Sequence, residues 1–428
     1  MTDFDSTSSK QPDQLVEHFF RHEYANLVSV LTRAFGFARI DLVEDMVSSA
    51  IIKAMNSWKQ NGIPKNPAGW IHRVARNQIL DSIRREKVHE KALAFALQQT
   101  SENQSTDEVI DRWLDEERLP DSLLSMMFVC CHPMLDHKTQ IALTLKILCG
   151  FSVAEIARGL LLSVAAVKKR IQRAKSELAE NNVSIEFPTT DELQARLSVV
   201  HDVLYLMFNE GYSTSHGIEP IRDDICEEAA RLCHMLCLHP SLNSPNSCAL
   251  LSLMLFHASR LEARTDSLGN IVLLGDQDRK LWNQDLIDEA DKWLVKSVKQ
   301  IPSRFHFEAV IAQFHCSARS LEETDWEKII LFYNRLMELF PSPVYRLNRA
   351  IALAQTGKSD EALEQLELIR NRPEMKDYFL VDCACAFIYE KTGDQKRATD
   401  CYLAALNSSL ADHQKQLIQK KLAALHAT

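Results

Sequence analysis

Apolar residues recur along most of this chain at intervals of three and four rather than two. The segment "DLVEDMVSSAIIKAM" keeps this spacing from residue 41, and "AGWIHRVARNQILDSIRREK" resumes it after the break "NGIPKNP". Such spacing places apolar side chains on one face of an α-helix, whereas a half-buried strand alternates them. Gly and Pro are scarce, at 11 and 13 of 428 residues. The pattern predicts an all-α fold.

Polar residues and glycines mark where several of these helices begin and end. Asp41 is predicted to cap the helix that follows it, and Asn66 precedes Pro67 in a suitable first turn. The helix containing "LYLMFNEGY" is predicted to end at Gly211, because glycine accepts the left-handed conformation common after a last turn.

Breaks in the periodicity divide the chain into six parts. We expect a disordered tail over residues 1–14, a helical domain over 15–88, a flexible acidic linker over 89–119, a second helical domain over 120–182, a helical connecting domain over 183–303, and repeats over 304–428.

The repeats are visible as an offset of 36 residues. Ala350, Leu353, Gly357, Ala362 and Leu366 recur as Ala386, Tyr389, Gly393, Ala398 and Tyr402. Small residues at a helix crossing and a glycine in the turn resemble the tetratricopeptide repeat, whose period is about 34 residues. An ordinary array of helical hairpins without a recognition groove is the alternative.

The charge of the chain is unevenly distributed. The net charge is -9, yet residues 1–185 contain 23 Lys and Arg against 23 Asp and Glu, so the acidic excess lies entirely in residues 186–428. Within the neutral part, residues 59–87 carry seven basic and two acidic residues, and residues 138–175 carry eight and one. Such basic islands are typical of nucleic-acid binding.

The second island contains two short predicted helices. Ser152 and Glu155 form a capping box for the first, and Ser163 can cap the second. The second helix has an apolar inner face, and its outer face carries Lys169, Gln172 and Arg173, flanked by Lys168, Arg170 and Lys175. This layout is that of a helix-turn-helix, whose second helix enters the DNA major groove. The alternative is a solvated basic face.

The first island has a different character. On "WIHRVARNQILDSIRR", Arg73, Asn77 and Arg84 share one face, with Arg76 close by and Trp70 at its border. Aromatic rings stack on unpaired bases and arginines hold phosphates, so this face suits a single strand. Alternatively, Trp70 belongs to the core and the arginines are simply solvated.

Other features exclude several classes of protein. The chain lacks a nucleophile elbow, a P-loop and an HExxH motif, so we expect no enzymatic activity and no cofactor. Cys226, Cys233 and Cys237 follow the spacing of a buried helix face rather than that of a metal site. No apolar stretch reaches the ~18 residues of a membrane span, and the polar, acidic start is unlike a signal peptide. We therefore expect a cytoplasmic protein without a membrane partner.

The two islands, in this order, resemble regions 2 and 4 of bacterial RNA polymerase sigma factors of the extracytoplasmic-function type. The likeness covers residues 15–180, and "VLYLMFNEGYSTSHG" with the repeats resembles a subgroup that carries a tetratricopeptide-like extension. The resemblance implies polymerase-binding residues Asp41, Glu44, Asp45 and Ser48. It implies contacts with the -10 promoter element from Trp70, Arg73, Arg76, Asn77, Asp81, Arg84 and Arg85. It implies contacts with the -35 element from Lys168, Lys169, Arg170, Gln172, Arg173 and Lys175.

A function follows from this resemblance. Such a protein binds core RNA polymerase, directs it to specific promoters and assists promoter melting. Here the C-terminal extension would modulate that activity, and its repeats are a candidate surface for a protein partner. Two alternatives stay open: a tetratricopeptide-type scaffold for protein interactions, and a helix-turn-helix regulator that binds duplex DNA without polymerase.

Overall fold

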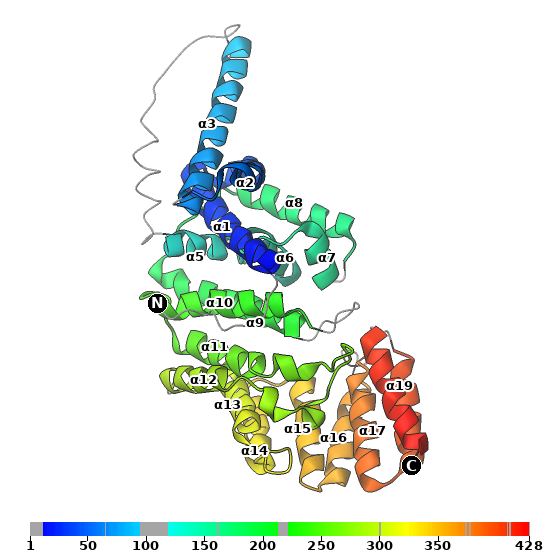
Figure 1. Ribbon diagram of the computed structural model, residues 1–428. Coiled ribbons are helices and arrows are strands. Elements are labelled where there is room, and N and C mark those ends of the chain that lie inside the picture. Colours follow the sequence, from blue (N-terminus) through cyan, green and yellow to red (C-terminus); the bar gives the residue numbers. More distant parts are fainter. Residues whose placement is uncertain are drawn as a thin grey trace. The chain divides into compact units, whose positions relative to one another are not determined.

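The computed structural model describes residues 12–64, 66–94, 119–160, 162–212, 221–298, 301–372, 375, 378–408, 410 and 412–427. Over these ranges the chain forms α-helices and short 3-10 helices, and no strand, which confirms the predicted all-α fold. The chain divides into two compact units, Met1–Val203 and Leu204–Thr428 (Figure 1).

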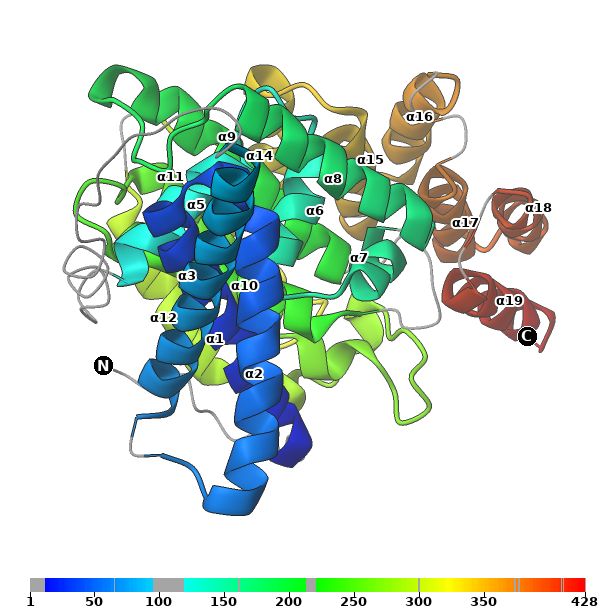
Figure 2. The same ribbon diagram turned by 90° about the horizontal axis from the view of Figure 1, so that it is seen from above.

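Unit 1 begins with α1 (Pro12–Phe35), α2 (Ile40–Asn61) and α3 (Pro67–Ala94). Helices α2 and α3 lie side by side (Figure 2). Their buried stripes keep the predicted spacing: Val43, Val47, Ala50 and Ala54 on α2, and Ile71, Ala75 and Ile79 on α3. Asn66 caps α3 as predicted, because its Oδ1 accepts a hydrogen bond from the amide of Gly69 at 2.8 Å.

The predicted cap of α2 is wrong. Helix α2 starts at Ile40, and Arg39 rather than Asp41 is the residue that precedes it. A 3-10 turn, Phe37–Arg39, leads directly into α2 after Gly36, whose positive φ of 87° lets the chain change direction. Asp41 therefore lies in the first helical turn, where a carboxylate still interacts favourably with the helix dipole.

Two domain boundaries differ from the expected ones by a few residues. Helix α1 begins at Pro12, within the predicted tail of residues 1–14, and residues 1–11 of that tail lie outside the described ranges. Helix α3 continues to Ala94, so the predicted linker of residues 89–119 starts as helix, and residues 95–118 again lie outside the described part.

The rest of unit 1 consists of α5 (Leu119–Cys130), α6 (His137–Ile147), α7 (Val153–Leu160), α8 (Val164–Glu180) and the start of α9 (Thr190–Tyr212). The predicted capping box is present, since Ser152 and Glu155 exchange hydrogen bonds of 2.7 and 3.2 Å. Ser163 accepts from the amide of Ala166 at 3.1 Å and so caps α8. Helices α7 and α8 thus form the expected helix-turn-helix pair (Figure 2).

Helix α9 runs through the boundary between the two units. Within unit 1, Arg196 donates a hydrogen bond of 2.6 Å to the carbonyl of Phe128 at the end of α5. The predicted helix end at Gly211 is wrong, because α9 includes Gly211 and continues to Tyr212. A Cβ at Gly211 would lie 2.9 Å from both the carbonyl oxygen of Arg222 and the sulfur of Cys226. The glycine thus permits a close approach of the next helix.

Unit 2 continues with α10 (Asp223–Leu238), α11 (Pro245–Ala258) and α12 (Gln284–Lys296), with three 3-10 turns, η2 (Leu261–Arg264), η3 (Leu274–Asp276) and η4 (Arg279–Leu281), before α12. Helix α11 is apolar on all sides and is buried from Ser247 to Phe256, because α10, α12 and α13 surround it. Cys226, Cys233 and Cys237 lie on the buried face of α10, as their spacing predicts.

The last part of unit 2 is a series of helical hairpins: α13 (Arg304–Ser317), α14 (Trp326–Leu339), α15 (Pro343–Gln355), α16 (Ser359–Arg370), α17 (Leu380–Thr392), α18 (Gln395–Leu406) and α19 (Asp412–Ala427). Helices α15, α16 and α17 lie side by side in chain order (Figure 1). Gly357 and Gly393, 36 residues apart, occupy equivalent turns with φ of 82° and 78°. Ala350 and Ala386 are both fully buried at the equivalent helix crossings.

A half-buried polar cluster joins α9 to these hairpins. The carboxylate of Glu308 on α13 accepts hydrogen bonds from Tyr205 on α9 at 2.9 Å and from Tyr345 on α15 at 2.5 Å. Burial raises the pKa of Glu308, although both hydrogen bonds favour its charged form. The cluster positions the end of α9 against the first hairpins of the repeats.

Candidate nucleic-acid interface

From Val164 to Ser176 the outer face of α8 is exposed and carries no acidic side chain. Lys168, Lys169, Gln172 and Arg173 are all exposed, whereas Val167, Ile171, Ala174 and Leu178 on the opposite side are buried. A shallow, open hollow of about 460 Å³ runs along this face, lined by Ala165, Lys168, Lys169, Gln172, Arg173 and Ser176. One ligand can therefore contact two lysine ammonium groups, the guanidinium group of Arg173 and the amide of Gln172 at the same time.

Arg170 lies at the edge of this face and is already engaged. Its Nη1 lies 2.9 Å from the Asp136 carboxylate and 3.0 Å from the hydroxyl of Thr139, and its side chain is 29% exposed. Burial opposes the charged form of Asp136, but the hydrogen bonds from Thr139 and the charge of Arg170 hold the pKa of Asp136 below its ordinary value. Arg170 thus fixes α8 to the start of α6.

Lys175 lies away from the exposed face. It is 8% exposed, and its Nζ donates to Asp41 at 2.7 Å and also to Glu44. Burial by itself would lower the pKa of Lys175, but the two carboxylates raise it above the ordinary value. The ammonium group therefore stays charged and links α8 to α2.

The four predicted polymerase-binding residues do not share one environment. Asp41, Asp45 and Ser48 are exposed at a spacing of four and three residues along α2, which places them on one strip. Glu44 is 7% exposed and accepts a hydrogen bond of 2.7 Å from the Tyr24 hydroxyl in addition to its contact with Lys175. Glu44 therefore belongs to the interior of unit 1 in this conformation.

The basic face of α3 is exposed from Arg73 to Arg85. Arg73, Asn77, Asp81, Arg84 and Arg85 are all exposed, and Asp81 lies 3.6 Å from Arg84. Since a surface pair of this kind contributes little energy, Arg84 remains available to another anion.

Two further residues border the face of α3. The ring of Trp70 is partly buried and meets Trp58 of α2 edge to face, with centroids 5.9 Å apart. Arg76 is partly buried. The structure therefore brings the predicted residues of this island together on one side of α3.

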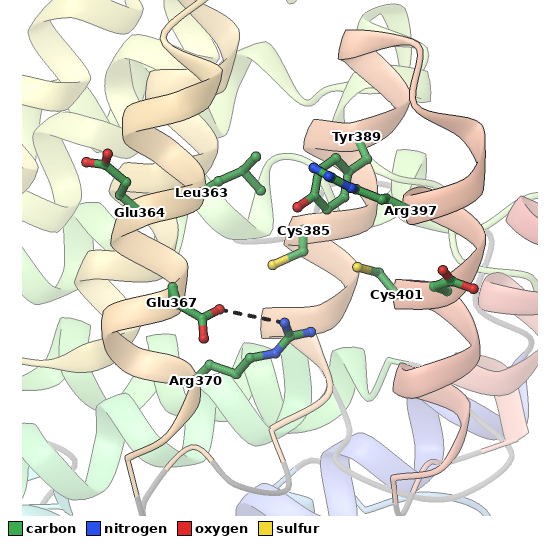
Figure 3. Close-up of a pocket in the computed structure, with 9 residues that line it drawn as sticks. Leu363, Glu364, Glu367, Arg370, Cys385, Tyr389, Arg397 and Cys401 are labelled. Atoms are coloured by element: carbon green, nitrogen blue, oxygen red, sulfur yellow. Dashed lines mark ion pairs between the residues drawn. The ribbon is translucent and has the colours of Figure 1, made fainter.

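The described ranges contain neither a group of three metal-ligating side chains nor a helix long and apolar enough to cross a membrane. The repeats also contain a groove of about 390 Å³ that the residue patterns did not predict. It is lined by Leu363, Glu364, Glu367, Arg370, Cys385, Tyr389, Arg397, Asp400 and Cys401 (Figure 3). The available signal was the presence of a cysteine in each helix of one hairpin, α17 and α18.

Family models match the two segments of the chain that carry the basic faces. Residues 19–88 match the family model "Sigma-70 region 2", and residues 125–178 match "Sigma-70, region 4". Residues 196–298 match a family of unknown function, DUF6596. A protein of Rhizobium meliloti (strain 1021) described as uncharacterised is 39% identical over 360 residues, which cover 82% of this chain and 84% of that relative. No solved structure matches the chain significantly.

Proposed function

The chain belongs to the sigma-70 family of RNA polymerase sigma factors, and we propose that it is a factor of the extracytoplasmic-function type that selects a two-part promoter and helps to melt it. A sigma factor binds core RNA polymerase and promoter DNA and acts in initiation without catalysing a reaction itself. The observation that carries the finer proposal is the pair of exposed basic faces, one on α3 and one on α8.

In this proposal α8 reads the -35 element. Arg173 and Gln172 can each make bidentate hydrogen bonds to base edges in the major groove, whereas Lys168 and Lys169 contact phosphates. Arg170 keeps its structural contact with Asp136 and borders the DNA.

The face of α3 takes the opened -10 strand. Trp70 offers a ring edge at the border, Asn77 offers an amide for a base, and Arg73, Arg84 and Arg85 offer charges for phosphates. Asp41, Asp45 and Ser48 of α2 bind the polymerase. Glu44 and Lys175 bind each other. Glu44 can therefore contact the polymerase, or Lys175 can contact DNA, only after this ion pair has broken.

Melting is tested by Asn77→Ala combined with Arg84→Ala. Both side chains are exposed, so the change removes contacts with DNA without opening a cavity. We expect permanganate footprinting to show a larger loss of promoter opening than the loss of polymerase binding seen by co-purification. Arg335→Ala on α14 is a matched control, since Arg335 also pairs with a carboxylate three residues away. An equal loss of opening and binding would show that the face only stabilises its domain.

The extension is tested by a chain that ends at Val203, which keeps the contact of Arg196 with Phe128. We propose that the extension supports initiation, because α9 continues into it without a break. The shortened chain is expected to bind core polymerase and to give little run-off transcript from a promoter that the full chain transcribes. A shortened chain more active than the full one would make the extension an inhibitor instead.

A further inference from the structure

Two cysteines of the repeats come together in an open groove. Cys385 lies on α17 and Cys401 lies on α18, and both line the groove of about 390 Å³ between α16, α17 and α18. Their side chains lie in the same part of the groove, with Arg370 nearby (Figure 3). Each of the two thiols shifts the pKa of the other, as expected for side chains that lie close together. Cys385 and Cys401 are only 6% and 8% exposed, and a small solute can approach them from the groove that they line.

A positively charged side chain, Arg370, lines the same groove and acts on one of the two thiols. Arg370, at the end of α16, pairs with Asp382 and lies 3.8 Å from Glu367, so its guanidinium group is held in place. The charge of the same group favours the thiolate form of Cys401 and so lowers its pKa. Hydrogen bonding from Cys385 and the charge of Arg370 outweigh burial and lower the pKa of Cys401 to about 7, while the pKa of Cys385 is raised. Cys401 is therefore the thiol of the pair that loses its proton more readily, and Cys385 is the one that keeps it.

Other cysteines of the chain lack this environment. Cys237 and Cys248 also shift the pKa of each other, but they are only 2% and 3% exposed. No arginine acts on them, and the pKa of each is raised. Burial raises the pKa of Cys131 to about 12. Because the thiolate is the nucleophile, these buried thiols are expected to react slowly.

We propose that Cys401 and Cys385 form a peroxide-reactive dithiol, with Cys401 as the attacking thiolate and Cys385 as the resolving thiol. The Cys401 sulfur attacks one oxygen of a hydroperoxide, the O–O bond breaks, and the leaving oxygen takes a proton to give water or an alcohol. Cys385 then attacks the sulfur of the resulting sulfenic acid at Cys401, and this step releases one water and leaves a disulfide. Overall, two thiols are oxidised to a disulfide, and one hydroperoxide is reduced by two electrons.

The hairpin geometry favours the second step. A disulfide requires the two cysteines to lie close together, and Cys385 and Cys401 line one groove on α17 and α18, which pack against each other. The disulfide would covalently join the two helices of one hairpin, and a thiol reductant would restore the dithiol.

The test uses the full chain treated with one equivalent of hydrogen peroxide at pH 7, then alkylated, digested and mapped by mass spectrometry. We expect a disulfide between residues 385 and 401 to appear before any other cysteine is oxidised. Cys385→Ser should instead accumulate a dimedone-reactive sulfenic acid at Cys401. Cys383→Ser is the matched control on the same helix and should leave the 385–401 disulfide unchanged.

A second variant tests the part played by the cation without altering either cysteine. Arg370→Gln should slow oxidation of Cys401 about ten-fold, because the thiolate fraction falls, and Arg370→Lys should recover part of the rate. Any one of three results would overturn the proposal. These are equal reactivity of the eleven cysteines, a disulfide that includes Cys383, and an unchanged rate of Cys401 oxidation in Arg370→Gln. None of these measurements depends on transcription, so they are independent of the proposed function.

Discussion

Replacing Lys175 with methionine is expected to lower the free energy of unfolding of unit 1 by about 3 to 5 kcal/mol. The substitution keeps the length of the side chain but leaves Glu44, 7% exposed, without its charged partner. Lys146 lies 3.9 Å from Glu44 and replaces only part of the lost interaction. Urea unfolding, with hydrogen exchange measured on peptides from α2 and α8, assigns the change to this unit.

Two further variants separate charge from packing at this site. Lys168→Met, on the exposed face of the same helix, is expected to change stability by less than about 0.5 kcal/mol. Adding Glu44→Gln to Lys175→Met should restore part of the loss, because it neutralises the buried carboxylate. A Lys175→Met protein as stable as the parent would mean that Glu44 does not need a cation in the interior.

Replacing Arg173 with alanine is expected to weaken binding to the cognate promoter by about 1 to 3 kcal/mol, roughly 5- to 150-fold, and to relax the preference at one base pair of the -35 element. Gln172→Ala should act in the same way at a neighbouring position. Lys169→Ala should weaken binding to all sequences alike and reduce the salt dependence by about one counterion. The measurement is binding of the polymerase holoenzyme to promoter variants over a range of salt concentrations.

Arg170→Ala provides the matched control on α8. Because Arg170 pairs with Asp136, its loss should loosen the contact between α6 and α8 and leave base preference unchanged. Promoter selectivity that survives the changes at Arg173, Gln172 and Lys169 would show that another element reads the -35 region.

The candidate site was partly accessible from local patterns. The three- and four-residue spacing predicted the buried and exposed faces of α3 and α8, and the caps at Asn66, Ser152 and Ser163 are present. These features depend on residues within one or two helical turns, where helix geometry determines which side chains are neighbours. The roles of the exposed side chains toward DNA and polymerase stay predictions.

Contacts between distant segments were not accessible in this way. On a helical wheel Lys175 flanks the basic face of α8, but its partners Asp41 and Glu44 precede it by 134 and 131 residues. Gly211 has the sequence signal of a helix end, yet it lies within α9 because the start of α10 packs against it. Both outcomes depend on how whole helices pack, which no local pattern encodes.

The sequence by itself determined the all-α fold, the two basic faces and the 36-residue offset of the repeats, because each is a periodic property of consecutive residues. Only the tertiary structure decided which cations point outward and which are buried, and that Cys385 and Cys401 share a groove with Arg370. The physical reason is that burial and electrostatic pairing depend on which side chains of different helices come into contact. These contacts form only when the helices pack against each other.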